Sequence, residues 1–130
     1  MKKIIPFTLF ESDDSAIKDV LAEIEEYADS CSNLECDGMT RVIDYLLTKK
    51  NVKHIVKGGS LSVKGVGDIP YHYWIELPDG RIIDYRARMW IGDKAPHGVF
   101  KPDKTMTYEG TPVQFKTNDF IFKILTMGNG

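Results

Sequence analysis

The chain has 130 residues, of which 42% are hydrophobic, and a formal net charge of −2. This length suits one domain, residues 1–130, with a core large enough to need no disulfides. The charged residues form no basic run, which argues against a nucleic-acid binder. No segment reaches the roughly 20 apolar residues of a membrane span.

The N-terminal segment contains an apolar run, residues 4–10, which Pro6 interrupts and acidic residues follow. A secretory signal would need a longer run and a small-residue cleavage site, so no signal peptide is predicted. We interpret the run as an opening strand or sheet edge. On the same grounds we expect a soluble protein of the cytoplasm.

Two helices are predicted next. Residues 13–15 (Asp-Asp-Ser) offer N-caps for the first, over residues 15–30, where apolar residues recur at helical spacing. The second is predicted over residues 36–50, with Cys36 in its first turn and on its apolar face. The thiol should therefore point towards whatever packs on that helix. Cys31 is interpreted as a small buried hydrophobe.

The rest of the chain predicts short strands, because runs of β-forming residues alternate with glycine and proline. These runs are residues 52–57, 61–66, 71–77, 81–86, 111–116 and 120–125. Gly58 and Gly59 predict a turn between the first two runs. Two helices followed by strands predict an α+β fold, with the two N-terminal helices packed on an antiparallel sheet.

The sequence HYWIELPDGRIIDYR predicts a hairpin of defined register. Pro78 fixes its own φ at about −65°, so Pro-Asp-Gly favours a type I turn followed by a left-handed glycine. This three-residue loop pairs Ile75 with Ile83. It also places His72 and Asp84 on one face as diagonal neighbours, roughly 7 Å apart at the backbone. A hydrogen bond between them is therefore predicted, although such pairs are more often half-exposed polar contacts than catalytic ones.

Cys36 extends this pair to a candidate triad. Its thiol would lie near unpaired backbone N–H groups and the positive end of a helix dipole, which favour the thiolate. If the helix packs on the face that carries His72, the imidazole can hold a proton beside the thiolate. Asp84 would then fix the imidazole tautomer. The backbone N–H of Cys36 or Asp37 could supply one oxyanion-hole donor.

The order and placement of these residues resemble the transglutaminase-like branch of the papain-like cysteine enzymes. HYWIELPDGRIIDYR is similar to the H-x-W-x-x-x-x-D-G-x-x-x-D pattern of small proteins in that superfamily, and CDGMTRVIDYLL to their Cys-led helix. The resemblance implies a papain-like core in which Cys36 is the nucleophile, His72 the general base and then acid, and Asp84 the orienting group. It implies acyl transfer through a thioester, with no cofactor, on an amide or isopeptide bond of a protein or peptide.

Four further residues are candidates for binding the substrate. Trp74 is similar to the family aromatic two residues after the histidine and could wall the site. Arg86 and Trp90 follow Asp84 closely and could bind an acidic or planar group. His97 lies in a loop rich in proline and glycine that could line a cleft.

Other functions stay open on the sequence alone. A non-catalytic binding or inhibitor module could keep the scaffold without the chemistry. A peptidoglycan amidase would use similar chemistry but would need export. No metal site is predicted, because two cysteines without a matching second pair make a poor zinc motif. His54, on a β-like run, is interpreted as a surface or edge histidine.

Overall fold

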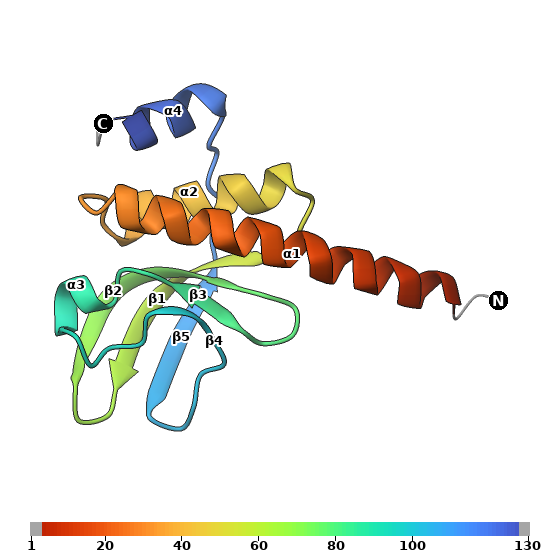
Figure 1. The fold of residues 1–130 in the computed structure, drawn as a ribbon. Coiled ribbons are helices and arrows are strands. Elements are labelled where there is room, and N and C mark those ends of the chain that lie inside the picture. The colour runs from red at the N-terminus through yellow and green to blue at the C-terminus, as the bar shows by residue number, and fades with distance from the viewer. Residues whose placement is uncertain (1–3, 128–130) are drawn as a thin grey trace.

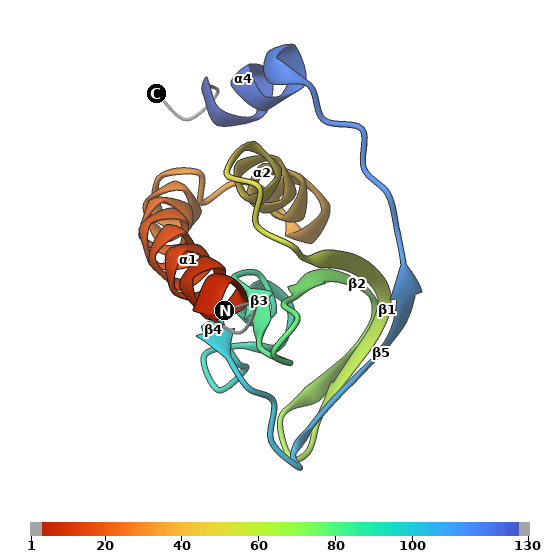
Figure 2. The same cartoon turned by 90° about the vertical axis from the view of Figure 1, so that its right-hand side faces the viewer.

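The computed structural model describes residues 4–127, with side chains described from residue 17 onward. This part of the chain forms α1 (Ile4–Ser30), α2 (Cys36–Lys49), β1 (Ile55–Val63), β2 (Gly67–Glu76), β3 (Ile82–Asp84), α3 (Arg88–Ile91), β4 (Gly98–Phe100), β5 (Met106–Pro112) and α4 (Asp119–Met127). The strands form one curved antiparallel sheet in the order β4-β3-β2-β1-β5 (Figure 2).

The helices lie in layers over this sheet. α1 and α2 cover it side by side, and α4 lies on the far side of α2 (Figure 1). Their apolar residues form one core with the sheet, which joins Ile24 of α1 and Ile43 of α2 to Ile75 of β2 and Ile83 of β3. The predicted arrangement, helices packed on an antiparallel sheet in an α+β fold, is confirmed.

The N-terminal apolar run opens α1 instead of forming the predicted strand, so that prediction is wrong. Pro6 falls in the first turn of this helix, where a backbone N–H has no intrahelical partner and its absence costs little. Farther along α1, Val20, Ile24 and Ala28 are buried as the helical spacing predicts. α1 has 27 residues. Neither it nor another helix of the described chain is long and apolar enough to cross a membrane.

α2 begins at the predicted residue and ends one residue earlier than predicted. Its apolar stripe is buried against α1 and the sheet. The carboxylate of Asp37 accepts a hydrogen bond from the backbone N–H of Gly38 at 2.8 Å, in the first turn. The hydroxyl of Thr40 donates to the carbonyl of Tyr73 in β2 at 3.4 Å. The N-terminal half of α2 is thus attached to the strand that carries His72.

Gly58 and Gly59 lie inside β1 and do not form the predicted turn, so that prediction is wrong. A Cβ on Gly59 would lie 2.0 Å from the carbonyl oxygen of Glu109 in β5. The glycine therefore permits a close approach of two strands, beside an irregularity in the β1–β2 register. The chain reverses between β1 and β2 at Gly65, whose φ is 77°.

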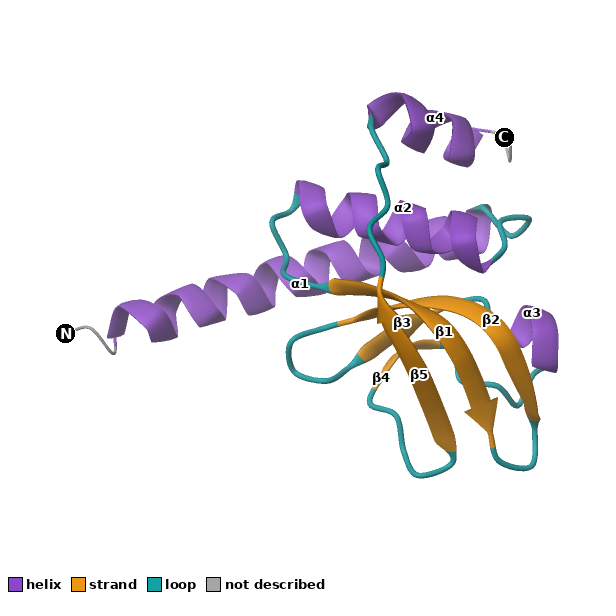
Figure 3. Cartoon of the chain, turned by 180° about the vertical axis from the view of Figure 1, so that it is seen from behind, coloured by secondary structure: helices purple, strands orange, loops and turns teal. Residues whose placement is uncertain are grey.

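The C-terminal third also differs from the prediction. β5 lies earlier than the run 111–116, and the run 120–125 is part of helix α4. The side chain of Asn118 accepts a hydrogen bond from the backbone N–H of Ile121 at 2.8 Å, as an N-cap does. The ring of Phe122 stacks on Tyr45 of α2 with centroids 4.2 Å apart. Packing on α2 therefore favours a helix in this segment. Figure 3 shows the loop after β5 running past α2 to reach α4.

Candidate active site

The β2–β3 hairpin has the register that its turn chemistry predicts. Ile75 pairs with Ile83. The backbone N–H of Leu77 donates to the carbonyl of Arg81 at 2.8 Å, which closes a three-residue loop. Gly80, the last residue of this loop, has a φ of 92°. The type I turn followed by a left-handed glycine therefore sets which residues of the two strands share a face.

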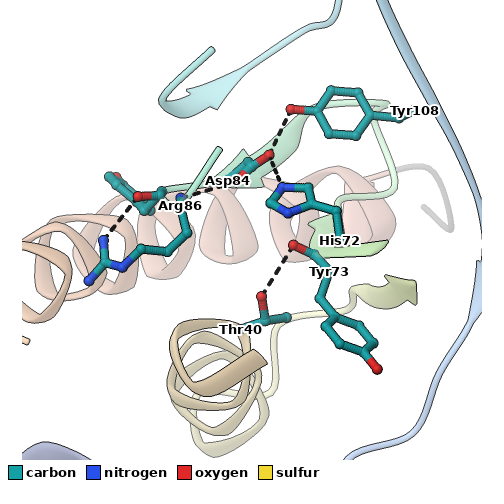
Figure 4. Close-up of polar contacts among 7 residues, drawn as sticks. Thr40, His72, Tyr73, Asp84, Arg86 and Tyr108 are labelled. Carbon is teal, nitrogen blue, oxygen red and sulfur yellow. Dashed lines mark hydrogen bonds and ion pairs between the residues drawn. The ribbon is translucent and has the colours of Figure 1, made fainter. Parts of the chain in front are cut away.

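This register brings His72 and Asp84 together. Nε2 of His72 lies 2.7 Å from Oδ2 of Asp84, and the two side chains are only 0% and 1% exposed (Figure 4). An ionised carboxylate only accepts hydrogen bonds, so Nε2 carries the proton. The other ring nitrogen, Nδ1, is buried and has no hydrogen-bond partner among the described residues. A neutral imidazole in this tautomer presents a free lone pair at Nδ1.

Cys36 is the first residue of α2, and only 8% of its surface is exposed. Its thiol is near enough to His72 to help raise the pKa of that imidazole, although Nδ1 makes no hydrogen bond among the described residues. Burial lowers the pKa of His72, but the hydrogen bond to Asp84 and the interaction with Cys36 outweigh it and raise that pKa to about 9. The three predicted triad residues therefore meet at one place, where the imidazolium form is favoured.

Asp84 has two further hydrogen-bond donors. The hydroxyl of Tyr108 donates to Oδ2 at 2.8 Å, and the backbone N–H of Arg86 donates to Oδ1 at 3.2 Å (Figure 4). Burial and the neighbouring Asp84 raise the pKa of Tyr108, so its hydroxyl stays protonated and able to donate. The carboxylate thus accepts hydrogen bonds from residues of β2 and β5 and from the backbone just after β3.

The sequence did not single out Tyr108. It lies on β5, outside the strand expected at residues 111–116, and 24 residues after Asp84. Only the pairing of β1 with both β2 and β5 brings it to the site. A correct position for β5 would have been the one sequence signal able to find it.

Trp74 lies against the histidine, where a wall of the site was predicted. Its indole is 1% exposed, its ring centroid is 6.1 Å from that of His72, and it meets the ring of Tyr108 at 4.9 Å. The indole Nε1 has no hydrogen-bond partner in the part of the chain with described side chains. Trp74 therefore excludes water from one side of the imidazole.

Arg86 has partners other than the acidic or planar substrate group predicted for it. Its Nε donates to the carbonyl of Leu34 at 2.5 Å, and one terminal nitrogen donates to the carbonyls of Ala28 and Cys31 at 3.0 and 2.8 Å. The other terminal nitrogen donates to the carbonyl of Tyr85 at 2.9 Å. The guanidinium is thus occupied by main-chain oxygens of its own protein.

The remaining two predicted binding residues lie on the surface beyond β3. Trp90 is in α3 and is half-exposed. His97 precedes β4, and its ring makes a T-shaped contact with that of Tyr85, with centroids 5.1 Å apart. Burial and the nearby Arg88 lower the pKa of His97. Neither Trp90 nor His97 forms a hydrogen bond with a triad residue, and their substrate-binding roles stay predictions.

His54 forms a second histidine–carboxylate pair, so its interpretation as a surface histidine is corrected. Its Nε2 lies 2.5 Å from Oδ1 of Asp44 in α2, and its Nδ1 lies 2.7 Å from the carbonyl of Val52. Burial lowers the pKa of His54, but these two hydrogen bonds raise it overall. The pair joins α2 to the segment before β1. The hydrogen bonds of His54 go to a carbonyl and a carboxylate, and none goes to a cysteine.

Cys31 is 1% exposed, and its interpretation as a buried residue is confirmed. Among the side chains of residues 17–127, no group of three or more His, Cys, Asp or Glu is arranged to hold a metal ion.

Comparisons with models of known protein families, with curated proteins and with solved structures find no significant match to the chain.

Proposed function

We propose that the protein is a cysteine-dependent acyl-transfer enzyme of the transglutaminase-like type, with a papain-like core. Its substrate would be an amide or isopeptide bond of a protein or peptide. One observation carries this proposal: the thiol of Cys36, at the N-terminus of α2, helps to raise the pKa of a buried imidazole that is hydrogen-bonded to Asp84.

In the first half of the proposed reaction, the thiolate of Cys36 attacks the carbonyl carbon of the substrate. A carbon–sulfur bond forms, and the carbonyl electron pair moves to the oxygen. The backbone N–H groups of Cys36 and Asp37 have no intrahelical acceptors and can stabilise this oxyanion. The carbon–nitrogen bond then breaks, the leaving nitrogen takes a proton from Nδ1 of His72, and a thioester remains on the sulfur.

In the second half, Nδ1 of His72 takes a proton from water or from an amine as that molecule attacks the thioester. The carbon–sulfur bond breaks, and the thiolate of Cys36 is restored. Water yields hydrolysis or deamidation, whereas an amine yields exchange. Throughout, Asp84 keeps the proton on Nε2, so that Nδ1 faces the reacting atoms.

A non-catalytic binding module is the competing function, and one observation favours it. The side chains of His72 and Asp84 are 0% and 1% exposed. Such burial would also serve a purely structural contact between β2 and β3. Under this hypothesis the thiol would be an ordinary core cysteine and would form no acyl intermediate.

An activated ester distinguishes the two functions. Wild type, Cys36→Ser and Cys31→Ser would be mixed with p-nitrophenyl acetate, and the acetylated residue located by mass spectrometry. We expect wild type and Cys31→Ser to release p-nitrophenol faster than Cys36→Ser, with a transient acetyl group on Cys36. Equal release from wild type and Cys36→Ser would favour the binding module.

A further inference from the structure

The side chain of Arg86 joins the end of β3 to the connection between α1 and α2. It hydrogen-bonds the carbonyls of Ala28 and Cys31 at the end of α1, and the carbonyl of Leu34 just before α2. Cys36 follows Leu34 by two residues. Three of the hydrogen bonds of Arg86 therefore hold the segment that leads directly to the thiol.

The chemistry of this contact suits an arginine. The last carbonyls of a helix have no intrahelical donor, and a cation is favoured at that end of the helix dipole. Arg86 is 7% exposed, and burial lowers its pKa, against the opposing effect of Cys31 and nearby acids. A guanidinium nevertheless stays charged in proteins, and its planar fork can reach several acceptors that a lysine ammonium could not.

The main chain of the same residue contacts the catalytic carboxylate. The backbone N–H of Arg86 donates to Oδ1 of Asp84 at 3.2 Å, the oxygen that His72 does not use. One residue thus contacts both Asp84 and the segment that precedes Cys36. Figure 4 shows Arg86 between α1 and the end of β3.

We propose that Arg86 is a positioning residue, which sets the separation of the Cys36 thiol from the His72 imidazole by holding residues 31–35 against the end of β3. This inference rests on the proposed function. Without the guanidinium, the connection loses two hydrogen bonds and the end of α1 loses a third, and the N-terminus of α2 is free to shift relative to the sheet. The thiol and the imidazole then interact less.

The strength of that interaction can be measured without a substrate. The pKa of His72 would be determined by NMR in wild type, Cys36→Ala, Arg86→Lys and the double variant. In wild type, Cys36 contributes to the raised value of about 9, so Cys36→Ala should lower it. We expect Arg86→Lys to lower it as well, and Cys36→Ala to cause little further change in the Arg86→Lys background.

Arg81→Lys is the matched control. Arg81 lies in the same hairpin, but its Nε binds Asp79 at the surface, at 2.8 Å. This variant should leave the pKa of His72 at its wild-type value. If Arg86→Lys does not fold, Arg86→Gln, which keeps two N–H donors without a buried charge, provides the same comparison.

The outcomes separate the two proposals. If Cys36→Ala changes the pKa of His72 equally with and without Arg86, the positioning role is overturned and the proposed function is untouched. If Cys36→Ala changes nothing in wild type, the thiol and imidazole do not interact, and both proposals fail.

Discussion

Nε2 of His72 lies 2.7 Å from Oδ2 of Asp84, across a hairpin whose loop has three residues. The contact follows from the turn: a loop one residue shorter would put the two side chains on opposite faces of the sheet. Because the two residues are only 12 apart in the sequence, local chemistry suffices to bring them together. The thiol of Cys36 reaches the pair only through the packing of α2 on β2.

Asp84→Asn should weaken the proposed catalyst without unfolding it. The amide can present its NH₂ group to Nε2, which would force the proton to Nδ1, where the thiol of Cys36 needs a proton acceptor to become a thiolate. We expect the pKa of His72 to fall from about 9 towards its ordinary value, and acylation by p-nitrophenyl acetate to slow by on the order of 100-fold or more. Asp68→Asn, at an exposed carboxylate bound by Ser62, is the control and should change neither. Unchanged acylation in Asp84→Asn would remove the aspartate from the mechanism.

Tyr108→Phe removes one hydrogen bond to Asp84 and keeps the ring that packs on Trp74. A hydrogen bond to a charged group in this setting contributes about 1–3 kcal/mol, so the free energy of unfolding should fall by that amount. Urea denaturation checks this, with Tyr71→Phe as the control because Tyr71 is 88% exposed. Equal losses in the two variants would mean that the Tyr108 hydroxyl contributes nothing specific.

The raised pKa of His72 predicts how stability depends on pH. The folded protein holds this proton up to a pH of about 9, whereas the unfolded chain releases it near the ordinary value of about 6.5. Between these values the folded state binds more protons, so the free energy of unfolding decreases as pH rises. The stabilisation is complete below about pH 6.5 and is lost as pH rises through about 9, on the order of 3 kcal/mol in all.

Urea denaturation of wild type and His72→Gln across this range measures the effect. The difference between the two proteins cancels the titration of other groups, such as His54. The difference should shrink as pH rises. A difference that is independent of pH would show that His72 does not change its protonation on unfolding.

Gly59→Ala tests the close approach of β1 and β5. A Cβ would lie 2.0 Å from the carbonyl oxygen of Glu109, which is main chain and cannot move without displacing its strand. Overpacking of this kind typically costs about 1–3 kcal/mol. Urea denaturation should therefore show a lower midpoint for Gly59→Ala than for Ser60→Ala, its neighbour in the strand. Equal urea midpoints for Gly59→Ala and Ser60→Ala would mean that β1 and β5 can move apart without a loss of stability.

The sequence predicts those parts of the fold that depend on local chemistry. The apolar stripe of α2 and the Pro-Asp-Gly turn placed Cys36, His72 and Asp84 correctly on their elements. The Gly58–Gly59 pair reads as a turn in isolation, because the strand that needs these glycines, β5, lies about 50 residues farther along the chain.

The same limit applies to the other differences. The segment 120–125 has strand-forming residues, but it packs as a helix against Tyr45 and α2. Arg86 was considered as a substrate-binding residue because the sequence gives no sign of its real partners. These are main-chain carbonyls, which every residue type carries. Tyr108 was missed for a related reason: two strands, β2 and β1, lie between β5 and the strand of its partner Asp84 in the sheet order.

The pH dependence of alkylation at Cys36 tests the proposed thiolate–imidazolium pair most directly. Wild type and His72→Ala would be treated with iodoacetamide at a series of pH values, and Cys36 and Cys31 followed separately by mass spectrometry. We expect Cys36 of wild type to react at about pH 6, where an ordinary thiol with a pKa of about 8.5 is almost unreactive, and His72→Ala to lose this reaction. If Cys36 reacts only at alkaline pH, and equally in both proteins, the three residues do not form a catalytic triad.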